Sequence, residues 1–87
     1  MEIRFTQAAR KHRVGRAAAR QVMAHTTPTG TLTTHGAPAW LWVGADDRGR
    51  ELEVIAVQVH SDRDPEPVLL VIHVMPTHLR GGGHADD

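Results

Sequence analysis

The chain has 87 residues, no cysteine and a formal net charge of zero at pH 7. Its length allows one domain with a small core, and the lack of cysteine excludes disulfides and thiolate metal sites. The sequence shows no apolar run of roughly 20 residues and no signal-peptide pattern. We therefore expect one cytoplasmic domain with no membrane contact over residues 1–80, and a flexible tail at 81–87.

Helix-forming sequence is concentrated near the N-terminus. Residues 2–5 alternate weakly and fit an edge strand or an extended lead-in. Thr6 is a suitable N-cap, because its hydroxyl can accept a hydrogen bond from a first-turn amide. Good helix formers follow at 7–13, and Gly15 then favours a break. Apolar spacing predicts a second helix from about Arg16 to His25.

Charge is distributed unevenly despite the neutral total. Residues 1–25 hold six basic residues and one acidic residue, a net charge of +5, and residues 26–87 carry −5. Arg13, Arg16 and Arg20 fall on one stripe of the second helix and are candidates for RNA binding. A polyanion or an acidic partner would suit this segment, and a solvated helix face that keeps the protein soluble fits the pattern equally well.

The remainder of the chain is typical of antiparallel strands. Residues 26–38 are rich in Thr, Pro and Gly and predict a connection that could hold a short strand at 31–34. Three strands are expected at 39–43, about 50–59 and 68 to about 75. Pro76 should end the last strand because it has no amide donor. The predicted fold class is α+β, with N-terminal helices packed on a three- to four-stranded antiparallel sheet.

The two hairpins give a register. A turn centred on residues 46–49 places Trp42 opposite Glu53 and Trp40 opposite Ile55, and the second hairpin places Ile55 opposite His73. Because side chains alternate between faces, one face would be aliphatic and the other mixed. The aliphatic face would carry Leu41, Val43, Leu52, Val54, Ile72 and Val74. The mixed face would carry Trp40, Trp42, Glu51, Glu53, His73, Met75 and Thr77.

The mixed face could be an ordinary solvated surface or a site of RNA chemistry. Metal-free RNA cleavage needs a base, an acid and a cation near the phosphate. Glu51 or Glu53 could be the base, and His73 or His78 could act as acid or base. Arg50 and Arg80 could contact the phosphate, and Trp40 and Trp42 could stack on unpaired bases. The seven histidines form no metal-ligand motif, so no metal or cofactor is expected.

Several short segments resemble those of BrnT-like and related RelE-superfamily toxins. They lie at residues 5–12, 14, 17–22, 42–44, 49–54 and 71–77, and the similarity spans about residues 5–80. The resemblance implies a helix-then-sheet fold and a ribonuclease that inhibits translation by cutting messenger RNA, on the ribosome in some members. It also implies a cognate antitoxin that covers the toxin and often helps to repress their shared operon.

The sequence departs from this family at two positions where arginine is common. Ala45 follows Gly44 in the first long strand, and Met75 stands near the end of the last strand, with Arg80 as the nearest arginine. The positions that best match the site residues of the family are Thr77 and the strand carboxylate, Glu51 or Glu53. These departures keep two functions open: an endoribonuclease toxin, and a non-catalytic module that binds a protein or RNA.

Overall fold

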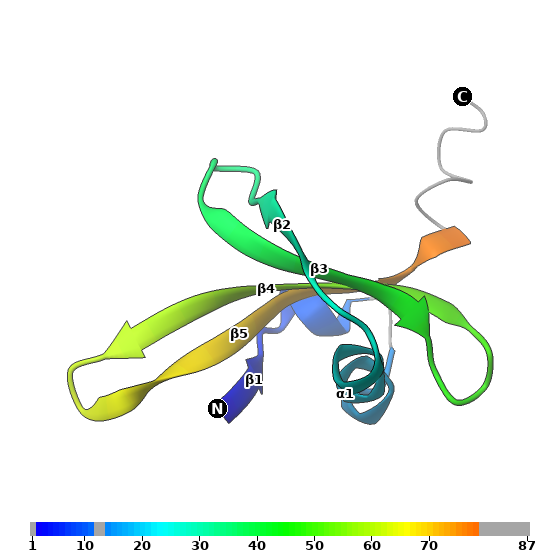
Figure 1. Ribbon diagram of the computed structural model, residues 1–87, viewed down its shortest axis with the longest axis horizontal. Coiled ribbons are helices and arrows are strands. Elements are labelled where there is room, and N and C mark those ends of the chain that lie inside the picture. The colour runs from blue at the N-terminus through cyan, green and yellow to red at the C-terminus, as the bar shows by residue number, and fades with distance from the viewer. Residues whose placement is uncertain (1, 12–13, 79–87) are drawn as a thin grey trace.

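The computed structural model describes residues 2–11 and 14–78. Within these residues the five strands form a single sheet with the order β1-β5-β4-β3-β2, and helix α1 lies on one side of it (Figure 1). The elements are β1 (Glu2–Phe5), the 3₁₀ turn η1 (Ala8–Arg10), α1 (Arg16–His25), β2 (Thr29–Leu32), β3 (Pro38–Ala45), β4 (Glu51–Ser61) and β5 (Asp64–Pro76).

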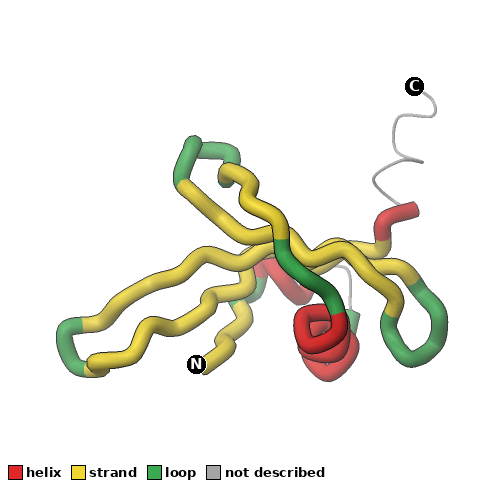
Figure 2. Tube along the Cα trace, viewed as in Figure 1, coloured by secondary structure: helices red, strands yellow, loops and turns green. Residues whose placement is uncertain are grey.

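The predicted fold class is wrong, because strands dominate the chain and the sheet is mixed. Strand β1 pairs in parallel with β5, from Glu2 opposite Val68 to Phe5 opposite Val71, whereas the other neighbouring strands are antiparallel. Parallel neighbours need a long connection, and here the connection comprises all the elements between them. Figure 2 shows how small the helical share of the described chain is.

Helix α1 was predicted with the right bounds, Arg16–His25, and Gly15 precedes it with an extended backbone. The earlier helix was wrong, because residues 8–10 make a single 3₁₀ turn. The Thr6 hydroxyl does accept a hydrogen bond from the Ala9 amide at 3.2 Å. Thr6 is also bonded through its own amide to the Val71 carbonyl at 3.0 Å, and this link to β5 ties the segment to the sheet.

The core lies between the sheet and the helical segments. Helix α1 packs on β3 and β4, and η1 packs on β5. The buried side chains are mostly small or aliphatic, as expected for a chain with three aromatic residues. The largest of the fully buried ones are Leu52, Val22, Val54, Val71 and Val74.

The predicted register of β3 on β4 is wrong by one residue. Trp42 pairs with Val54, and Val43 pairs with Glu53. The connecting turn spans five residues instead of four, since Asp46 closes it by donating its amide to the Arg50 carbonyl at 2.9 Å. A slip of one residue exchanges the faces of a strand. Trp42 is therefore in the core and 6% exposed, whereas Val43 is 39% exposed.

The pairing of β4 with β5 was predicted correctly at Ile55–His73, and in the same register Glu53 pairs with Met75. Beyond Ile55 the register shifts, because Ala56 pairs with Val71 and Ile72 is an extra residue in β5. We call the side that carries Trp42, Leu52 and Val54 the helix face. The side that carries Glu53, Ile55 and His73 is the open face.

The last two strands were predicted at about 50–59 and from 68. The connection between them is shorter in the structure, since β4 reaches Ser61 and β5 begins at Asp64. Pro67 is tolerated inside β5 because this part of the strand precedes its pairing with β1, which starts at Val68. At a sheet edge a missing amide donor costs little. The predicted end of β5 at Pro76 is confirmed.

Candidate functional site

Glu53 and His73 form a polar pair on the open face. The Nε2 atom of His73 lies 2.8 Å from the Oε2 atom of Glu53, which is a hydrogen-bond distance. Glu53 is only 4% exposed, and the His73 side chain is 32% exposed. Burial of a carboxylate is costly without hydrogen-bonding partners, so His73 helps to keep Glu53 in this position. The more accessible imidazole is the member of the pair that a ligand can reach.

The pair lines a hollow of about 640 Å³. Glu53, Ile55 and Val57 contribute from β4, and Ile72 and His73 from β5. Residues 32–35 and 37 contribute from the end of the β2–β3 hairpin. This hairpin rises from the sheet on the side away from α1 (Figure 1). The floor of the hollow is formed largely by the aliphatic side chains of β4 and β5, and the Glu53–His73 pair forms part of its wall.

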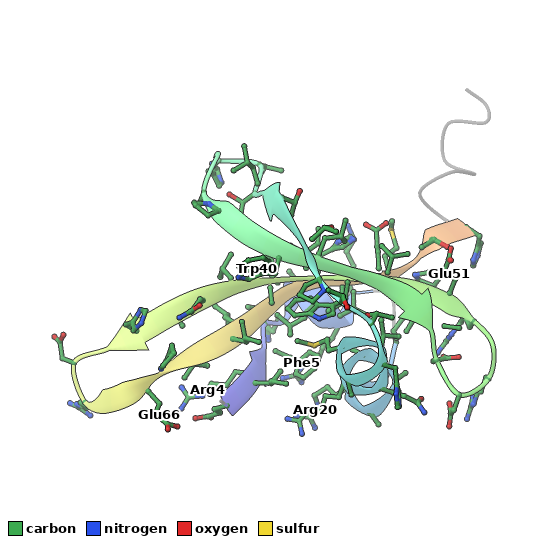
Figure 3. The ribbon with its side chains drawn as sticks, viewed as in Figure 1. Arg4, Phe5, Arg20, Trp40, Glu51 and Glu66 are labelled. Atoms are coloured by element: carbon green, nitrogen blue, oxygen red, sulfur yellow. The ribbon has the colours of Figure 1, made fainter. Side chains whose placement is uncertain are left out.

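Glu51, at the start of β4, and Thr77, directly after β5, make a second polar contact. The Thr77 hydroxyl donates to Glu51 Oε1 at 2.7 Å, and the contact is exposed. Figure 3 places Glu51 at the end of the sheet where β5 terminates. Glu51 and Glu53 are two residues apart in β4 and so point to the same face, but Glu51 is not part of the lining of the hollow.

Two of the three described arginines that were expected to contact RNA, Arg50 and Arg20, have intramolecular contacts. Arg50 Nε and Nη2 each lie 3.1 Å from Asp46 Oδ2. Arg20 Nη2 donates to the Ile3 carbonyl at 3.3 Å, and its guanidinium lies 5.8 Å from the centre of the Phe5 ring. Figure 3 shows Arg20 and Phe5 on the α1 side, away from Glu51. The structure does not bring these arginines to the hollow.

The other predicted site residues are separated. Arg16 is exposed on α1, and Trp40 is 43% exposed in β3. Trp42, being buried in the core, does not present its indole on the surface. Arg13, Arg80 and the tail at 81–87 lie outside the described residues. Of the predicted site residues, the structure groups Glu53 with His73 and Glu51 with Thr77.

Asp46, for which no specific role was predicted, organises the turn between β3 and β4. Its Oδ1 atom accepts from the Arg48 and Arg50 amides, both at 2.9 Å. Burial opposes the ionised form, but the hydrogen bonds from the amides of Arg50 and Arg48, together with the Arg50 side chain, outweigh it. The pKa of Asp46 is therefore lowered from its usual value. An Asp three residues before a Gly is the sequence signal for such a turn.

This lowered pKa predicts an acid-dependent loss of stability. Because the folded-state pKa lies below the unfolded one, the carboxylate stabilises the fold above about pH 4 and loses this effect as the pH falls further. We expect Asp46→Asn to unfold at lower denaturant concentration than wild type at pH 7, with the difference shrinking at pH 3. Urea denaturation at both pH values tests this, and an equal difference at both would contradict it.

Among the described residues no group of three or more His, Asp or Glu side chains is arranged to hold a metal ion. Within residues 2–11 and 14–78, no helix has the length and apolar character needed to cross a membrane. No protein-family model matches the chain, and neither does any curated protein or solved structure.

Proposed function

We propose that this protein is a metal-independent endoribonuclease that acts on RNA in the cytoplasm, as a toxin controlled by a cognate antitoxin. The observation that supports this best is the 2.8 Å contact between His73 and Glu53 in the wall of the hollow. A carboxylate that accepts a hydrogen bond from one imidazole nitrogen orients the ring and determines which nitrogen carries the proton.

The pair provides the first proton transfer of RNA cleavage. When the proton of neutral His73 is on Nε2 and directed at Glu53, the lone pair is on Nδ1. That atom takes the proton from the ribose 2′-hydroxyl, and the 2′-oxygen attacks the phosphorus. The bond from phosphorus to the 5′-oxygen breaks, the 5′-oxygen takes up a proton, and the products are a 2′,3′-cyclic phosphate and a 5′-hydroxyl.

The function is tested with the full-length protein and single-stranded RNA in the presence of a metal chelator. We expect cleavage that yields 2′,3′-cyclic phosphate ends, and none of DNA with the same sequence, because DNA lacks the 2′-hydroxyl. A DNA strand with a single ribonucleotide should be cut only there. We also expect induced synthesis of the protein to slow bacterial growth. If RNA stays intact with and without ribosomes, the proposal is wrong.

The alternative function is a binding module without catalysis. The observation that favours it is that Arg50 and Arg20 are engaged within the chain, so these cations are not directed at a phosphate in the hollow. Such a module would bind RNA with a steep salt dependence but leave it intact. Alternatively, it would bind an acidic protein partner and show no affinity for RNA.

A further inference from the structure

A second histidine, His35, lines the hollow that contains the Glu53–His73 pair. It lies in the loop between β2 and β3, within a segment predicted to be mainly a connection. Among the described residues that line this hollow, the titratable ones are His35 from the loop, Glu53 from β4 and His73 from β5. The lining therefore combines two imidazoles with one buried carboxylate.

The loop that carries His35 is fixed by hydrogen bonds around Thr33. The Thr33 hydroxyl accepts from the amides of His35 at 3.3 Å and Ala37 at 3.1 Å. The Thr33 amide donates to the Ala37 carbonyl at 2.8 Å, and its carbonyl accepts from Gly36 at 2.9 Å. Gly36 has a φ of 83°, which a side chain would disfavour. The backbone of His35 is thus held in place before any ligand binds.

We propose that His35 is the general acid of this site and that the hollow takes one unpaired nucleotide of a single-stranded RNA. This rests on the proposed ribonuclease function. The buried carboxylate of Glu53 is hydrogen-bonded to His73, which suits the His73 imidazole to accept a proton. His35 lacks such a partner among the hydrogen bonds of its loop, in which its backbone amide takes part. As an imidazolium it donates its proton to the departing 5′-oxygen.

The proton balance is complete with these two residues. His73 gains the proton of the 2′-hydroxyl, and His35 loses one to the 5′-oxygen, so that solvent resets both imidazoles after each turnover. The apolar floor formed by Ile55, Val57 and Ile72 suits the face of an unstacked base. A paired base is stacked within a duplex and does not present this face, so the site selects single strands.

The test compares two substrates that differ in their leaving group. A dinucleotide needs its 5′-oxygen protonated, whereas a uridine 3′-(p-nitrophenyl phosphate) releases a phenolate that needs no acid. We expect His35→Asn to lower kcat/KM on the dinucleotide by about 10²-fold or more and to change it little on the activated substrate. His73→Asn should impair both reactions. His60→Asn, at an exposed position of β4 outside the hollow, is the matched control and should leave both unchanged.

The pH profile gives a second readout that a purely structural role of His35 would not produce. Wild-type kcat/KM on the dinucleotide should fall on the acid side, where the base is protonated, and on the alkaline side, where the acid has lost its proton. His35→Asn should lose the alkaline fall. Thermal melting of each variant confirms that it folds.

Three results overturn the inference, and they are distinguishable. If wild type cleaves RNA and His35→Asn cleaves it equally well, His35 is not the acid and the ribonuclease function stands. Equal impairment of His35→Asn on both substrates also excludes a proton donor. If wild type cuts neither substrate, the proposed function is wrong and the role of His35 is wrong with it.

Discussion

Replacing His73 with alanine is expected to lower RNA cleavage about 10²- to 10⁴-fold, which is the range of a general base. His73 is the accessible member of the pair with Glu53, and its imidazole faces the hollow. Removal of one partner from a buried hydrogen bond also costs about 1–3 kcal/mol of folding free energy. The measurement is therefore initial cleavage rate per folded molecule, with the folded fraction taken from circular dichroism.

Glu53→Gln separates the role of the carboxylate from that of the imidazole. Glutamine keeps the shape of the side chain and can still meet His73, but it lacks the negative charge. We expect a smaller loss of activity than with His73→Ala, mainly in kcat, because the ring is retained and loses only the charged partner that orients it. A well-folded His73→Ala variant with wild-type cleavage would contradict the assignment of His73 as the base.

Gly44→Ala should destabilise the protein by about 1–3 kcal/mol, the usual cost of overpacking. Gly44 in β3 lies against the end of α1, and a Cβ atom added there would overlap Cγ2 of Thr26. Thr26 cannot turn away without loss, because its hydroxyl donates to the Val22 carbonyl at 2.6 Å. Urea denaturation of wild type and variant, compared by midpoint at constant slope, measures this cost.

Two further variants test whether the effect of Gly44→Ala comes from the contact with Thr26. Thr26→Ser removes the methyl group and keeps the hydroxyl, so the double variant Gly44→Ala with Thr26→Ser should recover most of the lost stability. Gly30→Ala in β2 is the matched control, because a Cβ at this position meets no atom within 4 Å. Equal stability of Gly44→Ala and Gly30→Ala would show that α1 does not pack this closely on β3.

Local signals predicted the elements that depend on neighbouring residues in the sequence. The bounds of α1, the hydroxyl of Thr6 bonded to the Ala9 amide and the end of β5 at Pro76 all follow from helix propensity, capping and proline chemistry. The diagonal placement of Glu53 and His73 on one face followed from the β4–β5 register. That part of the candidate site was therefore readable from the sequence.

The errors arose where one residue or one distant contact decides the structure. A turn of four residues and a turn of five both fit the sequence around Asp46, and the Asp46–Arg50 hydrogen bonds select the longer one. That choice moved Trp42 from the expected mixed face into the core. The side chain of Arg50 was expected to contact a phosphate. In the structure it pairs with the carboxylate of Asp46, four residues earlier in the chain.

The contribution of His35 to the hollow could not be predicted from periodicity. Along the chain, β3 separates this loop from Glu53, and β3 and β4 separate it from His73. The bend of the β2–β3 hairpin brings the loop over the open face. Thr33 and Gly36 gave a signal for a tight turn, but no signal for the direction in which the hairpin bends.

The parallel pairing of β1 with β5 also affects how the molecule forms. Glu2 and its partner Val68 are 66 positions apart, so β1 must wait for the synthesis of β5 before it can join the sheet. Contacts this distant in sequence slow folding, because a long loop must close before they form. The hairpins from β2 to β5 can assemble first, with β1 added at the edge. A nascent chain therefore cannot complete this sheet until β5 has been synthesised.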